Sequence, residues 1–149
     1  TLIEAVSLGG TTDRTVNGVT FDGQTTRDDF GAGFENSDIY QGGGIGAVFE
    51  NLMDGFAFTG TNPAEITVTG LTIGETYLLQ VFLADHRNNQ AGKKIQCDVQ
   101  TYTSAIVDRD DNTSLVCRFE ADATSETFEI TGSSGGGPLI NGFQIRELP

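Results

Sequence analysis

Basic side chains are scarce in this chain of 149 residues, which has 8 Lys and Arg against 21 Asp and Glu and a formal net charge of -13. Its isoelectric point is near 4.1. Such a charge repels the phosphate backbone of nucleic acids and anionic membrane surfaces, so neither is expected as a partner. The surplus carboxylates suit solubility or the binding of calcium.

The side chains on which many catalytic and zinc sites depend are also few. The chain has one histidine, His86, and two cysteines that form no Cys-x-x-Cys pair, so a zinc site is poorly supported. It contains no Gly-x-Ser-x-Gly elbow, and neither cysteine has a catalytic context. With 21 Asp and Glu, many carboxylate pairs could be chosen as the acid and base of a glycoside hydrolase, so such pairs are no evidence for that activity. We expect a protein that is not an enzyme.

Long apolar runs are missing as well. No stretch approaches the ~20 apolar residues of a membrane span, and the first residues, TLIEAVSLGG, carry no basic leader. We interpret the chain as a module of a longer secreted or cell-surface protein whose signal peptide has been removed. We therefore expect an extracellular location and a tether to other domains.

The two cysteines, Cys97 and Cys117, lie in segments predicted to be strands of one sheet. A disulfide between them is the favoured interpretation, and it would indicate an oxidising compartment. The alternative is a pair of buried free thiols that behave as small apolar residues.

The chain does contain many short apolar clusters, separated by Gly, Asn, Asp, Ser and Thr. We predict about nine strands with turn signals roughly every 8 to 12 residues. One of them, TVNGVTFDG, covers residues 15–23, and another, ETYLLQVFLAD at 75–85, has apolar residues on both faces and is predicted to be central. Residues 24–46 are predicted to form a long surface loop.

One segment follows a different period. In AVFENLMDGFAF, residues 47–58, the apolar residues recur every 3.6 positions, which predicts a short helix that Gly55 could end. No βαβ alternation and no repeat occurs. Residues 1–149 are thus predicted to be a single all-β domain, an antiparallel jelly-roll-like β-sandwich with one short helix.

Four segments carry a resemblance to a known family: NGVTFDG (17–23), GLTIGETYLLQVFLADHR (70–87), LVCRFEADATSETFEITGS (115–133) and PLINGFQIREL (138–148). Together they resemble extracellular bacterial β-sandwich modules of the galactose-binding-like or malectin-like type. The resemblance implies the sandwich fold, structural calcium near the first strands, and a non-catalytic module that binds a polysaccharide or oligosaccharide. The chain departs from usual sugar-binding modules in having no tryptophan; Tyr40, Tyr102 and His86 are candidates to replace its stacking face.

The predicted central strand ends in the polar cluster DHRNN, residues 85–89. Asp85, Arg87 and Asn89 would share one side of the strand, with His86 and Asn88 on the other. Forked guanidinium donors beside carboxylate and amide oxygens suit vicinal sugar hydroxyls. The alternative for Asp85 and Arg87, which we favour, is an ion pair that clamps the strand end. His86, Asn88 and Asn89 are then the better candidates for sugar contact.

A calcium site is predicted in VDRDDNTS, where Asp108, Asp110 and Asn112 alternate oxygen ligands. The match to an EF-hand loop is poor, because Phe119 stands where the twelfth-position Glu would be, so an exposed acidic turn is the alternative. We expect the ligand site to combine this loop, with Arg109, and the strand end, with Tyr102 nearby. Unless calcium or Arg87 and Arg109 neutralise the site, an acidic module should prefer neutral or cationic glycans.

A further polar group could hold calcium or line a groove: Arg27, Asp28, Asp29, Glu35, Asn36 and Asp38. The main alternative function is a structural or adhesive spacer in a large surface protein, which binds no glycan. It accounts equally well for the acidity, the Gly-rich loops and the missing tryptophan.

Overall fold

The computed structural model describes residues 1–35, 39–40, 46–87, 94–108, 113–133 and 137–149. Among these residues nearly all regular structure is β-strand and the single helix is α1, so the predicted all-β fold with one short helix is confirmed. The elements are β1 (Leu2–Leu8), β2 (Arg14–Val16), β3 (Val19–Gln24), β4 (Gly31–Glu35), α1 (Ala47–Asp54), β5 (Gly55–Phe58), β6 (Ala64–Thr69), β7 (Thr76–Leu83), β8 (Lys94–Val99), β9 (Tyr102–Thr103), β10 (Val107–Asp108), β11 (Thr113–Glu120), β12 (Ser125–Gly132), β13 (Leu139–Ile140) and β14 (Gly142–Glu147).

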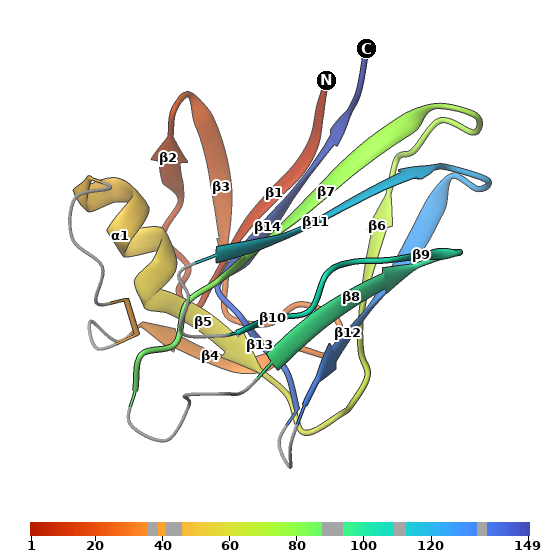
Figure 1. The fold of residues 1–149 in the computed structure, drawn as a ribbon. Helices are drawn as coiled ribbons and strands as arrows, with labels where there is room; N and C mark the ends of the chain where they lie inside the picture. The colour runs from red at the N-terminus through yellow and green to blue at the C-terminus, as the bar shows by residue number, and fades with distance from the viewer. Residues whose placement is uncertain (36–38, 41–45, 88–93, 109–112, 134–136) are drawn as a thin grey trace.

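Two sheets face one another as a sandwich (Figure 1). The first has the strand order β11-β7-β14-β1-β3-β2, and the second has the order β10-β8-β12-β6 with β9 paired to β8. A small third sheet, β13-β5-β4, lies beside α1. Neighbouring strands are antiparallel apart from β1 and β3, which run parallel. Within the described residues, no helix has the length and apolar character needed to cross a membrane.

The main core fills the space between the two sheets. Strand β7 is paired on both sides, with β11 and β14, so its predicted central position is confirmed. Its alternate residues point into this core, where apolar burial is the main force that holds the sheets together. From β7 these residues are Tyr77, Leu79, Val81 and Leu83, and from the second sheet they include Ile66, Val68, Cys97, Phe128 and Ile130.

A second, smaller core lies on the outer face of the first sheet, under α1. Phe82 and Ala84, on the other face of β7 and its extension, pack there with Leu52 and Met53 of the helix. The helix ends at Asp54, immediately before Gly55 as predicted, and Gly55 is also the first residue of β5. A side chain at Gly55 would lie 2.2 Å from the carbonyl oxygen of Leu8, so glycine lets β5 approach β1 this closely.

Asn141 ties the helix to the first sheet. Its side chain is fully buried and accepts a hydrogen bond from the Ala84 backbone N–H at 2.6 Å. Its amide group donates to the carbonyl oxygens of Met53 at 2.5 Å and Gly55 at 3.0 Å. Met53 is in the last turn of α1, where carbonyls have no partner within the helix. One amide therefore fixes the end of α1 against the end of β7.

Two local predictions were wrong. Residues 15–23 form a hairpin of β2 and β3 rather than one strand, because Asn17 and Gly18 both adopt positive φ in a two-residue turn. Residues 24–46, predicted as a surface loop, contain β4, which pairs with β5. Phe30 and Ile39 in this segment are fully buried. Isolated apolar residues give no periodic signal, which is why their burial escaped the sequence pattern.

The cysteines also differ from the prediction. Cys97 is in β8 and Cys117 in β11, which belong to different sheets that face each other. Both are buried free thiols, so the predicted disulfide is not formed in this structure. The Cys117 Sγ lies 3.8 Å from the Cys97 carbonyl oxygen. A hydrogen bond with Cys117 and burial raise the pKa of the Cys97 thiol. Strands of both sheets alternate buried and exposed residues in the same way, so this pattern does not show which sheet a strand joins.

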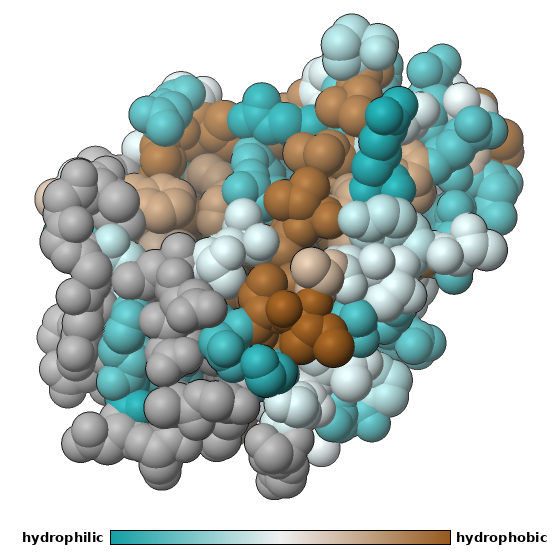
Figure 2. Space-filling model, viewed as in Figure 1, coloured by the Kyte–Doolittle hydropathy of each residue, from teal (hydrophilic) through white to brown (hydrophobic). Residues whose placement is uncertain are grey.

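Some apolar side chains remain at the surface. They include Val116 on β11 and Ile106, which precedes β10. Figure 2 shows apolar surface running down the middle of the face that carries these strands, with hydrophilic surface on either side. Val116 lies opposite Gln80 in the neighbouring strand β7, so its side chain is on the outer face of the first sheet.

Candidate functional site

The end of β7 forms a clamp. The Asp85 side chain is fully buried, and Arg87 donates a forked pair of hydrogen bonds to it, from Nε at 2.8 Å and from Nη2 at 2.9 Å. The bond to Asp85 raises the pKa of Arg87, although burial opposes this. The guanidinium also lies 4.6 Å from the centre of the Phe56 ring. The fork uses both carboxylate oxygens, which is the geometry of the ion pair that we favoured for these two residues.

His86 ties a separate segment to the clamp. Its backbone N–H and its ring atom Nδ1 both lie 2.9 Å from the carbonyl oxygen of Ile39. Because a carbonyl only accepts, Nδ1 carries a proton in this contact. The His86 ring meets the edge of Tyr40 with 6.3 Å between ring centres. These contacts hold residues 39 and 40 against the end of the strand.

Two further predicted site residues are described, Tyr102 and Asp108, and they pair with opposite ends of β8. The Tyr102 hydroxyl donates to the Val116 carbonyl at 3.2 Å, which links the edges of the two sheets. Asp108 accepts from Lys94 Nζ at 3.4 Å, and its other oxygen is buried with no hydrogen-bond partner among the described residues. No cluster of three or more acidic, histidine or cysteine side chains in the described part of the chain could hold a metal. Five predicted residues lie outside the described residues: Asn88, Asn89, Arg109, Asp110 and Asn112.

The acidic group near the start of the chain binds backbone and arginine. Asp28 and Asp29 accept hydrogen bonds from the backbone N–H groups of Thr67 at 2.9 Å and Glu65 at 3.0 Å. Both donors belong to β6, the edge strand of the second sheet, so the carboxylates satisfy an otherwise open edge. Arg27 bonds Glu4 and the Thr67 carbonyl, and Glu35 pairs with Arg14. Asn36 and Asp38 lie outside the described residues.

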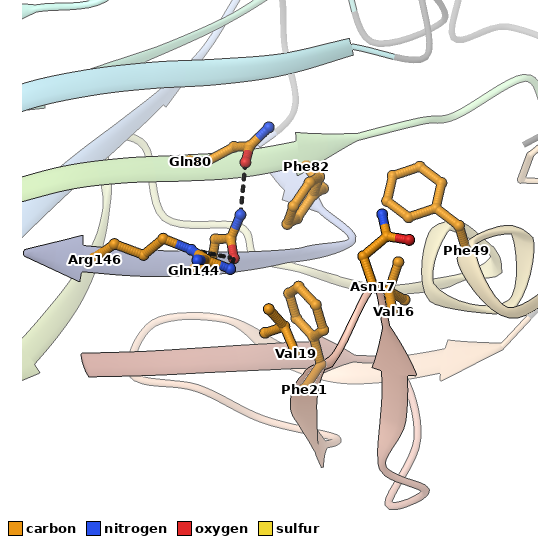
Figure 3. A pocket seen from close by; sticks show the side chains of 9 residues that line it. All are labelled: Val16, Asn17, Val19, Phe21, Phe49, Gln80, Phe82, Gln144 and Arg146. Atoms are coloured by element: carbon orange, nitrogen blue, oxygen red, sulfur yellow. Dashed lines mark hydrogen bonds between the residues drawn. The ribbon is translucent and has the colours of Figure 1, made fainter. Parts of the chain in front are cut away.

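A groove lies instead on the outer face of the first sheet, beneath α1 and the β2–β3 turn (Figure 3). It consists of two hollows of about 270 Å³ and about 350 Å³ that share Phe49, Gln80 and Phe82. We refer to it as the outer groove. The described residues that line it come from the β2–β3 hairpin, from α1 and residue 40, and from strands β7, β11 and β14: Val16, Asn17, Val19, Phe21, Tyr40, Phe49, Met53, Gln80, Phe82, Thr113, Ser114, Gln144 and Arg146.

Strand register determines which side chains meet on the groove floor. Phe82 stands opposite Gly142 in β14, and the backbone of β1 at Val6 occupies the place that a side chain at position 142 would take. One row along, Gln80 stands opposite Gln144, and Gln144 stands opposite Ala5 in β1. Phe82 and the Gln80–Gln144 pair thus lie in neighbouring rows of the groove floor. The wall is completed by the β2–β3 hairpin, whose Asn-Gly turn carries the Asn17 carboxamide toward the groove (Figure 3).

A chain of hydrogen bonds crosses the groove floor. Arg146 donates to Gln144 Oε1 from Nε at 3.2 Å and from Nη2 at 3.1 Å. Gln144 Nε2 donates to Gln80 Oε1 at 2.7 Å, and Gln80 Nε2 donates to Ser114 Oγ at 3.0 Å. We call these four residues the amide ladder. It spans three neighbouring strands, β14, β7 and β11.

Arg146 sets the direction of the whole ladder. A guanidinium has donors only, so the Gln144 amide must turn its oxygen to Arg146 and its NH₂ group to Gln80. Gln80 must then present its oxygen to Gln144 and its NH₂ group to Ser114. The Ser114 hydroxyl accepts and keeps its own hydrogen for another partner. The floor of the groove therefore presents amide N–H groups and a hydroxyl in a defined orientation.

Aromatic side chains line the other surfaces. Phe82 and Phe21 are only 6% and 2% exposed, and their rings meet edge to face at 5.7 Å. They shape the groove but offer little surface to a ligand. Phe49 and Tyr40 are half-buried, so they retain ring surface for contact. The Tyr40 backbone N–H donates to Asp54 at 3.2 Å, which holds Tyr40 beside α1.

Sequence reasoning named Tyr40 as an aromatic candidate but missed the ladder. Gln80 was a visible signal, since it interrupts the apolar outer face of the central strand between Leu78 and Phe82. The Asn-Gly turn was a second signal, for the hairpin that brings Asn17 to the groove. The pairing of Gln80 with Gln144, which are 64 residues apart, is set by strand order and has no local signal.

No protein-family model matches the chain, and it matches no curated protein in sequence. Solved structures do match its fold. The ectodomain of ANX2 from Arabidopsis thaliana superposes with a TM-score of 0.70 at 14% identity, over 99% of this chain and 50% of that one. A calcium-binding mutant of Bacteroides uniformis β-glucuronidase 2 gives 0.69 at 12% identity, over 98% and 18%. The plant receptor-like kinase FER gives 0.64 at 10% identity, over 98% and 42%.

At these identities the similarity establishes the fold and no more. The chain spans half or less of each of these longer proteins. Its fold is thus that of a β-sandwich also found in a plant ectodomain, a plant receptor-like kinase and a bacterial β-glucuronidase, which supports the predicted sandwich fold.

Proposed function

We propose that this domain is a non-catalytic carbohydrate-binding module of a secreted or cell-surface protein, and that the outer groove is its ligand site. The observation that supports this most is the amide ladder, which lies on the floor of a groove with aromatic and apolar walls. Of the two hollows, the one of about 350 Å³ is at the lower end of the range of small-molecule sites, roughly 300–1,000 Å³, and the one of about 270 Å³ is just below it.

The ladder suits the chemistry of a sugar. Hydroxyl groups both donate and accept hydrogen bonds, and carboxamides offer both functions in a fixed plane. Gln80, Gln144 and Asn17 each bring a carboxamide to the groove, and Ser114 brings a hydroxyl. The apolar face of a sugar ring would lie against Phe49 or Tyr40, which replace the missing tryptophan.

The composition of the groove favours binding over turnover. Its described lining contains no carboxylate, histidine or thiol that could act as a nucleophile, acid or base. Ser114 accepts its ladder bond from an amide, which does not remove a proton from a hydroxyl. Calcium at Asp108, Asp110 and Asn112 remains a prediction, which unfolding in calcium and in chelator would test.

The proposal is tested by thermal unfolding of the domain with a panel of neutral and acidic polysaccharides. A bound glycan raises the unfolding midpoint by mass action. We expect a rise for particular glycans with the wild type and a much smaller rise with Gln144→Leu. Gln96→Leu is the matched control. Gln96 is also a half-buried strand residue, but it lies in the second sheet, where its side-chain amide donates a hydrogen bond to the Ser104 carbonyl oxygen.

Two results would contradict the proposal. If no glycan moves the midpoint, the spacer alternative is preferred. If a glycan moves the midpoints of Gln144→Leu and Gln96→Leu equally, the ligand binds elsewhere than the outer groove.

A further inference from the structure

Only some of the Lys and Arg side chains of this acidic chain form ion pairs with carboxylates. Four of the described Lys and Arg side chains form ion pairs with carboxylates: Arg14, Arg27, Arg87 and Lys94. Within the described residues, Arg118 and Arg146 form none. In a chain with 21 acids and 8 Lys and Arg, cations without a carboxylate partner are unusual enough to need a reason.

Both of these arginines are on the outer face of the first sheet. Arg118 in β11 and Arg146 in β14 lie opposite the same residue, Leu78 in β7, from either side. Their backbones are therefore two strand spacings apart, about 10 Å. Arg146 lines the outer groove, and Arg118 is exposed in the same row. The two positive charges thus flank one end of the groove.

The guanidinium of Arg146 is held in place yet still has donors to offer. Nε and Nη2 both bond the neutral oxygen of Gln144, which fixes the plane of the group (Figure 3). An arginine side chain has five N–H donors, and these two bonds use two of them. A planar carboxylate is the partner whose geometry best matches the rest of the fork.

The surroundings leave room for an anion. No Asp or Glu occurs in the described lining of the groove. The net charge of -13 repels anions at long range, but salt screens this repulsion beyond about 8 Å at physiological ionic strength. A direct contact with Arg146 is screened much less. The sequence-based preference for neutral or cationic glycans therefore does not follow at this position.

We propose that the outer groove selects glycans that carry carboxylates, namely uronic-acid oligosaccharides, and that Arg146 binds the carboxylate while Arg118 adds to the local positive potential. This rests on the proposed function, that the groove binds a glycan. Nothing in the proposal requires a reaction, because the carboxylate is held by hydrogen bonds and charge alone.

The test measures affinity by calorimetry for oligoglucuronate, oligogalacturonate and oligomannuronate, each beside its carboxyl-reduced, neutral counterpart. We expect an acidic ligand to bind at least about tenfold more tightly than its neutral form, as a charged hydrogen bond provides. Arg146→Gln should abolish this ratio, Arg146→Lys should keep part of it, and Arg118→Gln should lower it slightly. Lys94→Gln removes the same charge far from the groove and should leave the ratio unchanged.

The outcomes separate this proposal from the one on which it rests. If neutral and acidic forms bind equally and Arg146→Gln changes neither, selection of carboxylates is wrong while glycan binding stands. If Lys94→Gln lowers the ratio as much as Arg146→Gln, the effect is one of overall charge and the proposal fails. If no member of either series binds while another glycan of the panel raises the unfolding midpoint, this inference fails and the proposed function stands. If no glycan of the panel does so either, both fail.

Discussion

Two polar clusters lie along β7, one at its end and one at its middle. Each contains an arginine, but only the arginine at the end is paired with a carboxylate. At the end, Arg87 turns its fork onto the buried carboxylate of Asp85 and stacks over Phe56. In the middle, Arg146 from the neighbouring strand donates only to the neutral amide of Gln144. Gln144 in turn donates to Gln80, and Gln80 donates to Ser114. The first cluster is closed by its own counter-charge. The second is oriented but still open to a ligand.

The comparison teaches that a polar cluster has to be judged by its partners. Asp85 and Arg87 were candidates for sugar contact as well as for the favoured ion pair, and in the structure they bond each other. Gln80 and Gln144 looked unremarkable, yet they arrange the groove floor. Changes at the clamp should therefore affect stability and leave binding intact, and changes at the ladder should do the reverse.

The largest effect is expected for Arg87→Ala. This change leaves the carboxylate of Asp85, which is 0% exposed, without its forked partner. We expect a loss of about 3–5 kcal/mol in the free energy of unfolding, as when one member of a buried ion pair is removed. Chemical denaturation measures it, with Arg87→Lys as the control that keeps the charge but not the fork. A loss under about 1 kcal/mol would mean that the clamp is dispensable.

Next in size is Asn141→Asp, which keeps the shape of the side chain but replaces its donor group with an oxygen. That oxygen would face the carbonyls of Met53 and Gly55, to which Asn141 now donates. We expect a loss of about 2–4 kcal/mol, because two buried acceptors lose their donor. Hydrogen exchange should show the loss first in α1. Unchanged protection of α1 would contradict the role of Asn141 in placing the groove wall.

A smaller effect on stability, but a large one on binding, is expected for Gln80→Leu. This change breaks the ladder at its middle and leaves Ser114 and Gln144 in a groove that water can enter. We expect the free energy of unfolding to change by less than about 1 kcal/mol. Glycan affinity should fall at least about tenfold, measured by calorimetry. A variant that binds as well as the wild type would remove the ladder from the site.

The smallest effect is expected for Asp54→Asn. Burial raises the pKa of Asp54, the hydrogen bond from the Tyr40 N–H lowers it, and Glu50 raises it, with a net upward shift from 3.8. The unfolded chain then loses this proton at lower pH than the folded one, so stability from this group declines as pH rises from about 3.8 to the higher folded value. Asp54 also ends α1, where the helix dipole disfavours a negative charge.

Asn at this position removes the charge and can still accept from Tyr40. We expect Asp54→Asn to be more stable than the wild type at pH 7 by about 0.3–1 kcal/mol and equal to it below both pKa values. Thermal unfolding across the pH range checks this. A variant that is less stable at pH 7, or a gap that does not change with pH, would contradict the account.

The fold was largely predictable because its signals are local. Apolar residues on both faces identified β7 as a central strand, and the 3.6-residue period with Gly55 identified α1 and its end. The β2–β3 hairpin could also have been found, since its Asn-Gly turn has a known preference for positive φ. Which sheet each strand joins was not readable, as Cys97 and Cys117 show by lying in sheets that face each other.

The site was hardly predictable because it depends on contacts between distant segments. The ladder joins Gln80, Ser114 and Gln144, which come together only when β7 is placed between β11 and β14. The pairing of Gln80 with Gln144 on the groove floor again follows from strand register. Polar residues at a strand end are easy to notice in a sequence. The role of an amide in the middle of a strand can be assigned only when its partners on the neighbouring strands are known.

The most direct test of the central claim is a nuclear magnetic resonance titration of the isotope-labelled domain with the glycan that raises its unfolding midpoint most. The side-chain amide signals of Gln80, Gln144 and Asn17 and the Arg146 Nε–H signal report on the groove, and the Arg87 Nε–H signal reports on the clamp. We predict that the groove signals shift with saturation while the Arg87 signal stays in place. Saturable shifts at Arg87 and His86, with the Gln80 and Gln144 signals unmoved, would contradict the account.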